Sequence, residues 1–565
     1  MRIGVLEERS RPGQISYRFA HGFFRQTLYE EMIAPRRLRL HQEVARALEA
    51  QYGARREEHA AELAEHFAQS TDRADLAKAV EYGELAAQRA MSVYAYAEAA
   101  SHLERCFAVQ EVLDPDDRVK RIDLLLALGE ARMPAGEPQR VADETALEAL
   151  KLAEAASDEN RASRACVLAL RALYRQTGLG IQAEAWREWA LRADSHTRPE
   201  TPERIYVDIS LASVEVNEGH LARARDMLRA ALDLSRLQGD PETMYWAASL
   251  LLSRNFGFLH GEKLALAQAL RFAPRTGVTP RTLTFLLNTM ARTYLVAGDR
   301  ASFEAISDEM DELASRTRDP NAIVNTRVRE AIHATFDGWL EDAIETEKSA
   351  MEQAETLGIP GAGLLLVHLA IPAHLYLGAP LQAIGQSTQP IAQTLHAREA
   401  AGDPLFLAHI GRSERAVEIW KNTLGPATEL TPVANAMGLE VAILSRDVDL
   451  ANALMATLAE RADYLVHVGF LVATGRLLGE GAALLGRPDE ARGYYEQALE
   501  VCTKVRFRPE LALTRLSLAE LLLEHYTDER DAAIEHLDFA IAEFREMKMQ
   551  PSLERVLRHR GLLKA

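Results

Sequence analysis

The chain has 565 residues, and its 65 Lys and Arg residues against 83 Asp and Glu residues give a formal net charge of −18. This balance argues against direct binding of nucleic acid, because phosphate contacts need clustered positive charge. Apolar residues make up 48%, as in a folded soluble protein. No stretch of about 18 uncharged apolar residues occurs, so we expect no membrane span. The three cysteines are widely separated, which excludes a secreted disulfide scaffold and favours a reducing cytoplasm.

The first segment of the chain predicts two short strands, Gly4–Glu8 and Ile15–Phe19, around the turn Arg11–Gly13. Two helices follow from Gly22, with a break near Pro35. Up to about residue 60 the chain carries a small net positive charge, whereas the remainder is strongly acidic. We therefore expect a boundary near residue 55, with a small module at 1–55 and a second domain at 56–565.

The remainder predicts helix almost throughout. Strong helix formers dominate, and apolar residues recur at spacings of three and four, as in the stretch that begins at Ala79. The breaks are short and rich in turn residues, as at Gly298–Asp299 and Gly486–Pro488. Strand-like alternation is almost absent after the first twenty residues. The pattern indicates an all-α protein.

Internal repeats organise this helical region. Gly479, Gly486, Ala491, Tyr495 and Ala498 stand at the offsets of the tetratricopeptide pattern, in which small residues let paired helices approach and a large residue fills the gap. This resemblance implies a right-handed α-α superhelix of irregular repeats, bent near 385–450 where the repeats degrade. Further copies include Gly219, Ala224, Leu228 and Ala231; Gly411, Ala416 and Trp420; and Gly338, Ala343 and Ala350, with Glu347 in place of the large apolar residue.

The segment YRFAHGFFRQTLYEEMIAPRRLRLHQEVARALEAQYG at 17–53 resembles the end of the winged-helix module in STAND-class signalling ATPases. In that class a P-loop ATPase precedes a winged helix and a long tetratricopeptide-like array. Members include regulators related to the maltose activator and proteins linked to class III adenylate or guanylate cyclases. The resemblance implies that residues 1–55 are a partial winged helix and that the array is a sensor.

The chain departs from that class because no G-x-x-x-x-G-K-[ST] motif occurs in it. We therefore expect no catalysis and no cofactor, and we interpret the chain as a sensor or interaction arm that binds a protein or small effector. The resemblance implies an ATPase partner in the same or another chain. The alternatives are the tail of a cyclase or ATP-dependent regulator whose catalytic part lies upstream, and a free-standing adaptor. A DNA-binding regulator is the weaker option because of the acidic charge.

Five residues are candidates for function. The resemblance implies that His21 senses the nucleotide state, and the alternative is a histidine that caps the strand–helix junction. The helix spacing places Asn288 and Arg292 on the concave face of the array, where Arg254 and Asn255 approach them, so that they could hold a carboxylate or a sugar hydroxyl. The alternative is ordinary solvated surface. No metal is expected, since His59 and His66 lack a metal-binding spacing.

Overall fold

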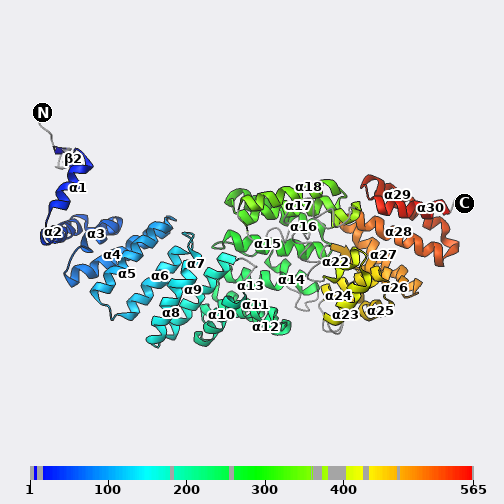
Figure 1. The fold of residues 1–565 in the computed structure, drawn as a ribbon, viewed down its shortest axis with the longest axis horizontal. Coiled ribbons are helices and arrows are strands. Elements are labelled where there is room, and N and C mark those ends of the chain that lie inside the picture. The colour runs from blue at the N-terminus through cyan, green and yellow to red at the C-terminus, as the bar shows by residue number, and fades with distance from the viewer. Residues whose placement is uncertain are drawn as a thin grey trace. The chain divides into compact units, whose positions relative to one another are not determined.

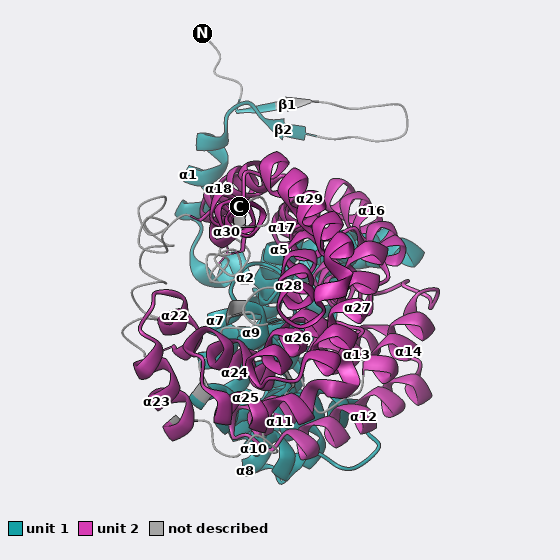
Figure 2. Cartoon of the chain, turned by 90° about the vertical axis from the view of Figure 1, so that its right-hand side faces the viewer, with its two compact units in different colours: residues 1–210 teal, residues 211–565 magenta. Residues whose placement is uncertain are grey.

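The computed structural model describes residues 5–8, 17–177, 183–253, 260–357, 359, 372–378, 403–423, 432–467 and 471–562. Helices dominate these residues (Figure 1), which confirms the predicted all-α repeat architecture. The chain divides into two compact units, residues 1–210 and 211–565 (Figure 2). Among the described residues, no helix is long and apolar enough to cross a membrane.

The first unit begins with the expected β-hairpin. Strand β1 (Leu6–Glu8) pairs antiparallel with β2 (Tyr17–Phe19), and the expected turn at Arg11–Gly13 lies outside the described residues. Helices α1 (Gly22–Glu31) and α2 (Ala34–Tyr52) follow, and α1 buries none of its residues. The assignment to a winged helix and the boundary near residue 55 remain predictions.

Helix pairs fill the rest of the first unit. Gly83 on α4 permits close packing on α5, because a Cβ at this position would overlap the sulfur of Cys106. All three cysteines are free and buried. The elements are η1 (Gly53–His59), α3 (Ala60–Phe67), α4 (Arg73–Ser92), α5 (Tyr96–Leu113), α6 (Arg118–Arg132), α7 (Pro138–Arg140), η2 (Val141–Thr145), α8 (Ala146–Ala155), α9 (Glu159–Thr177), α10 (Ala183–His196) and the first part of α11 (Pro202–Asn217).

The second unit continues the series of paired helices. The elements from α12 to α24 are α12 (Leu221–Gln238), α13 (Pro241–Ser253), α14 (His260–Leu270), α15 (Pro280–Val296), α16 (Arg300–Thr317), α17 (Pro320–Phe336), α18 (Leu340–Thr356), α22 (Pro404–His409), α23 (Ser413–Thr423) and α24 (Pro432–Ser445). The later elements are α25 (Val448–Leu458), η4 (Ala459–Arg461), β3 (Leu465–His467), β4 (Leu471–Ala473), α26 (Thr474–Leu484), α27 (Pro488–Val505), α28 (Arg508–His525), η5 (Thr527–Glu529), α29 (Arg530–Glu546) and α30 (Gln550–Leu562).

The repeat glycines have two structural roles in this unit. Gly219, Gly338, Gly411 and Gly486 all adopt a positive φ between paired helices, a conformation that glycine reaches without steric cost. Gly479 instead provides space, because a Cβ there would overlap the ring of Tyr495. These roles explain why small residues recur at fixed offsets in the sequence.

Strands β3 and β4 form a second antiparallel hairpin, in which Val466 pairs with Val472. These strands of three residues each are the only ones among the described residues after the first twenty, where strand-like alternation in the sequence is almost absent. The segment combines Leu, Val and Phe with Gly469, a composition that favours a short hairpin over a helix.

Helices far apart in sequence also pack together within the second unit. Arg300 on α16 donates from Nη1 to the carbonyl oxygen of Val505 at 3.2 Å. The ring of Phe336 stacks on that of Phe507, with 3.9 Å between ring centroids. Helices α16 and α17 therefore lie against the segment that joins α27 to α28. The bend expected near 385–450 remains a prediction, since 379–402 and 424–431 lie outside the described residues.

Candidate functional site

Helix α15 is the frame of the candidate site. The hydroxyl of Thr279 caps its first turn by accepting a hydrogen bond from the amide of Thr282 at 3.4 Å. Pro280 occupies the first helical position. A backbone N–H there would have no acceptor within the helix, so the missing N–H of proline costs no hydrogen bond. Most of the following side chains are buried, on more than one face of the helix.

One narrow stripe of α15 is the exception. Beyond Pro280, solvent reaches only four of its side chains, and these are spaced by four, three and four residues, so they share one face. Asn288 and Arg292 are consecutive members of this set, and Arg292 is its most exposed member. We call this set the α15 stripe: Arg281, Phe285, Asn288 and Arg292.

The guanidinium of Arg292 combines exposure with a desolvating environment. Its side chain is exposed, yet desolvation by the protein around it lowers its pKa. Among the described residues, no side chain or backbone group pairs with Arg292 by a hydrogen bond or ion pair. Its charge is therefore available to a ligand.

Lys263 on α14 brings a second positive charge near Arg292. Its side chain is buried, and its Nζ donates to the carbonyl oxygen of Leu252, in the last turn of α13, at 2.9 Å. Burial, together with the charge of Arg292, lowers the pKa of Lys263 to about 8. The amine thus remains mainly protonated at neutral pH.

Residues from much later in the chain complete this region. The ring of His260, the first residue of α14, stacks on Tyr464 with 4.6 Å between centroids. Burial lowers the pKa of His260 to about 4, with contributions from the positive charges of Lys263 and Arg461, so the ring is neutral at neutral pH. Arg461 ends η4 and donates to the carbonyl oxygen of Thr457 at 2.9 Å.

We call Lys263, Arg292 and Arg461 the basic cluster. Strand β3, which follows η4 closely, packs against α15 and so holds this part of the chain beside the stripe. No described carboxylate contributes to the pKa shifts of Lys263, Arg292 or His260. Within the described part of the chain, the guanidinium of Arg292 therefore has no carboxylate partner.

The sequence-predicted residues are distributed unevenly over this site. Asn288 and Arg292 lie together on the α15 stripe, whereas Arg254 and Asn255 lie outside the described residues. Lys263 and Arg461 were not among the candidates. No sequence signal pointed to Arg461, because only the fold of the second unit brings η4 and β3 to α15.

His21 lies in the first unit at the N-terminus of α1. Its Nδ1 accepts a hydrogen bond from the amide of Phe23 at 3.1 Å, and its side chain is exposed. This is the geometry of a helix cap. A role for His21 in sensing a nucleotide remains a prediction that follows from the family resemblance alone.

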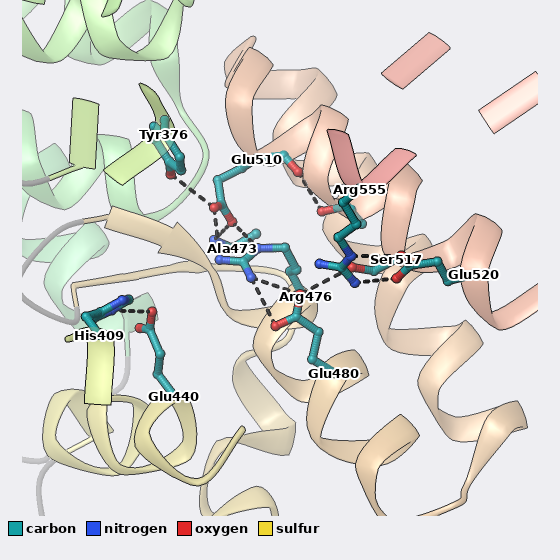
Figure 3. A network of polar contacts seen from close by, with 11 residues as sticks. Tyr376, His409, Glu440, Ala473, Arg476, Glu480, Glu510, Ser517, Glu520 and Arg555 are labelled. Carbon is teal, nitrogen blue, oxygen red and sulfur yellow. Dashed lines mark hydrogen bonds and ion pairs between the residues drawn. The ribbon is translucent and has the colours of Figure 1, made fainter. Parts of the chain in front are cut away.

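A second polar group in the second unit is centred on a buried ion pair (Figure 3). Arg476 on α26 donates from Nε and Nη2 to the buried carboxylate of Glu510 on α28, at 2.8 and 3.0 Å. Glu510 also accepts from the amide of Ala473 and the hydroxyl of Tyr376. Burial opposes the charge of Arg476, but the carboxylates of Glu510 and Glu480 outweigh it and raise its pKa. This network joins α26, α28 and the end of β4 through charges that the fold itself supplies.

One surface group has the residue types of a metal site. The ligand atoms of Glu215, Glu218 and His220 lie within 4.8 Å of one another. His220 hydrogen-bonds Glu215 at 2.8 Å, and Arg223 pairs with the same carboxylate at 3.2 Å. These contacts account for the group as a surface ion-pair cluster.

The sequence matches no protein family model and no curated protein. Among solved structures, it is similar to a chain from the crystal structure of the APC/C hetero-tetramer Cut9–Hcn1, with 15% identity, a TM-score of 0.41, and coverage of 94% of this chain and 98% of that one. It is also similar to a circular tandem repeat protein with novel repeat topology, with 15% identity, a TM-score of 0.15, and coverage of 93% and 99%.

Proposed function

We propose that this protein is a non-catalytic sensing and interaction arm of a cytoplasmic signalling ATPase. It binds a protein or small effector on the face of the second unit that carries the α15 stripe. The observation that supports this proposal is the exposed Arg292, which has no partner in the described part of the chain, on a helix whose other faces are buried. A helical repeat array suits this task, since it presents an extended surface on a scaffold of stacked pairs.

The N-terminal segment supports docking onto a second protein domain. Helix α1 buries none of its residues, and large apolar side chains are exposed along the segment, among them Phe23 at 65% and Ile33 at 70%. Apolar groups gathered in this way are typical of surfaces that a partner covers. The partner that the family resemblance implies is the ATPase, in the same or another chain, with Arg36, Arg37 and Arg39 at the rim of the contact.

Signal transfer by this arm is a population shift. An effector that binds one conformation of the array more tightly increases the share of that conformation, and with it one mode of docking on the ATPase. The size of the response is limited by the difference between the effector's affinities for the two conformations of the array.

Cross-linking in the source cell tests the proposal. The tagged full chain is cross-linked, and the linked peptides are identified by mass spectrometry. We expect links between residues 17–40 and a domain that contains a P-loop. The double variant Phe23→Ser/Ile33→Ser should lose them, whereas Phe272→Ser, which alters a phenylalanine that is 91% exposed in the second unit, should keep them. Links that survive in the double variant contradict the proposed docking surface.

A free-standing adaptor is the second candidate. The α15 stripe and the apolar N-terminal segment are two distinct surfaces, one in each compact unit, as an adaptor requires. The same experiment separates the two functions, because an adaptor gives constant links to a protein without a P-loop. A cyclase or regulator tail instead gives links to catalytic sequence in its own chain.

A further inference from the structure

We infer that the basic cluster of Lys263, Arg292 and Arg461 is an anion site, and that it takes a carboxylate or phosphate group of the ligand. This inference rests on the proposed function only for the biological use of the ligand. Anion binding itself is a property of the isolated full chain and is measured without any partner.

The positions of the three cations provide the first argument. They come from α14, η4 and α15, and strand β3 holds the η4 segment beside α15. Arg292 stands on the one face of α15 that solvent reaches, so a ligand has access to its guanidinium. Asn288, one helical turn away on the same stripe, adds an amide that can donate to the same ligand.

The missing counter-charge provides the second argument. Elsewhere in this unit, buried arginines have carboxylate partners: Arg300 pairs with Asp337 at 2.7 Å, and Arg476 pairs with Glu510 at 2.8 Å. No ion pair joins Arg292 to any described carboxylate, and its surroundings also desolvate it. Like charges placed together in protein surroundings repel one another, which raises the free energy of the unliganded state. A bound anion compensates this repulsion, so the repulsion favours anion binding.

The chemistry of the groups defines the ligand class. A guanidinium offers a planar fork of donors that matches the two oxygens of a carboxylate or phosphate, and a lysine adds a compact positive charge. The neutral ring of His260 on Tyr464 gives this region an aromatic wall that does not compete for the anion. A neutral sugar would leave the positive charge unbalanced.

Titration calorimetry tests the inference directly. The full chain is titrated with sodium phosphate and with succinate at pH 7, and sodium chloride keeps the ionic strength constant. We expect binding that Arg292→Gln weakens by about tenfold or more, the factor that one lost charged contact gives. The control is Arg415→Gln, which alters an exposed arginine of α23 that pairs on the surface with Glu418.

The outcomes separate the ligand sources and the two proposals. Phosphate binding that depends on Arg292 supports a phosphate ligand, and succinate binding that depends on Arg292 supports a carboxylate ligand. Equal affinities for the parent chain and Arg292→Gln, or no binding to the parent chain, overturn the inference. Loss of the cross-links to a P-loop domain leaves this result intact, so failure of the proposed function is recognised separately.

A pH series provides a second readout. Lys263, whose pKa is about 8, carries its charge below that pH and loses it above. Affinity for succinate, which stays fully ionised between pH 7 and pH 9, should therefore fall as the pH rises through this range. A flat profile removes Lys263 from the site.

Discussion

At the scale of single residues, Glu347 is a buried carboxyl group that has no hydrogen-bond partner among the residues the structure describes. It lies on α18, and neither side-chain oxygen has a hydrogen-bond partner. Burial raises its pKa well above the ordinary value. The folded state therefore holds the neutral acid, while the unfolded chain ionises above about pH 4.5. The contribution of Glu347 to stability is thus unfavourable at neutral pH and becomes less so as the pH falls.

Glu347→Met should raise the free energy of unfolding at pH 7 by about 1–3 kcal/mol, since it removes an unsatisfied buried polar group. As the pH rises from 5 to 7, Glu347 should lower the stability of the parent chain, and the Glu347→Met variant should lack this contribution. Urea unfolding at both pH values measures the effect. The control Glu345→Met alters an exposed neighbour on the same helix. Equal changes in the two variants contradict this account.

Several features of single residues could be predicted from the sequence, and others could not. The repeat offsets identified Glu347 as a polar residue at a position that favours a large apolar one. They also placed Asn288 and Arg292 one turn apart. The hydrogen bond between His41 and His66, at 2.8 Å between Nδ1 atoms, had no sequence signal, because it joins side chains of α2 and α3 through their packing.

At the scale of elements, Glu510 links three parts of the second unit. It lies on α28, accepts from Arg476 on α26, and accepts from the amide of Ala473 at the end of β4. Its carboxylate is fully buried, so the charge of Arg476 depends on it. Removing one partner of a buried ion pair leaves the other uncompensated.

Glu510→Gln should therefore lower the free energy of unfolding by about 3–5 kcal/mol. The control Glu496→Gln alters a surface pair with Arg492 and should cost at most about 1 kcal/mol. Urea unfolding followed by circular dichroism measures both. A cost for Glu510→Gln as small as that of the control contradicts a supporting role for the network.

The predicted elements were most accurate where the repeat pattern is strong. Helices α26 and α27, which carry Gly479 and Tyr495, have the expected paired form. The hairpin β3–β4 was missed because its short strands stand among helical stretches and lack a Pro-Gly turn signal like that at Arg11–Gly13, which marked the first hairpin. This hairpin packs against α15, so the missed element is the one that completes the candidate site.

At the scale of the whole molecule, contacts between distant repeats determine which parts unfold together. The ring of Phe507 is buried against Phe336, and Arg508 donates to the carbonyl oxygen of Asp337 at 3.0 Å. These contacts cross about 170 residues of sequence within the second unit, so repeat periodicity cannot reveal them. The first unit has hydrophobic clusters of its own, one of which includes Leu103 and Leu124.

Phe507→Ala should lower the stability of the second unit by about 3–5 kcal/mol, because it leaves a cavity beside Phe336. Hydrogen exchange with mass spectrometry should show faster exchange in α16, α17, α27 and α28, while α4–α6 keep their protection, since each compact unit opens on its own. The control Phe272→Ala alters a ring that is exposed and should change neither unit. Faster exchange that extends equally into α4–α6 contradicts independent opening and makes the chain one cooperative folding unit.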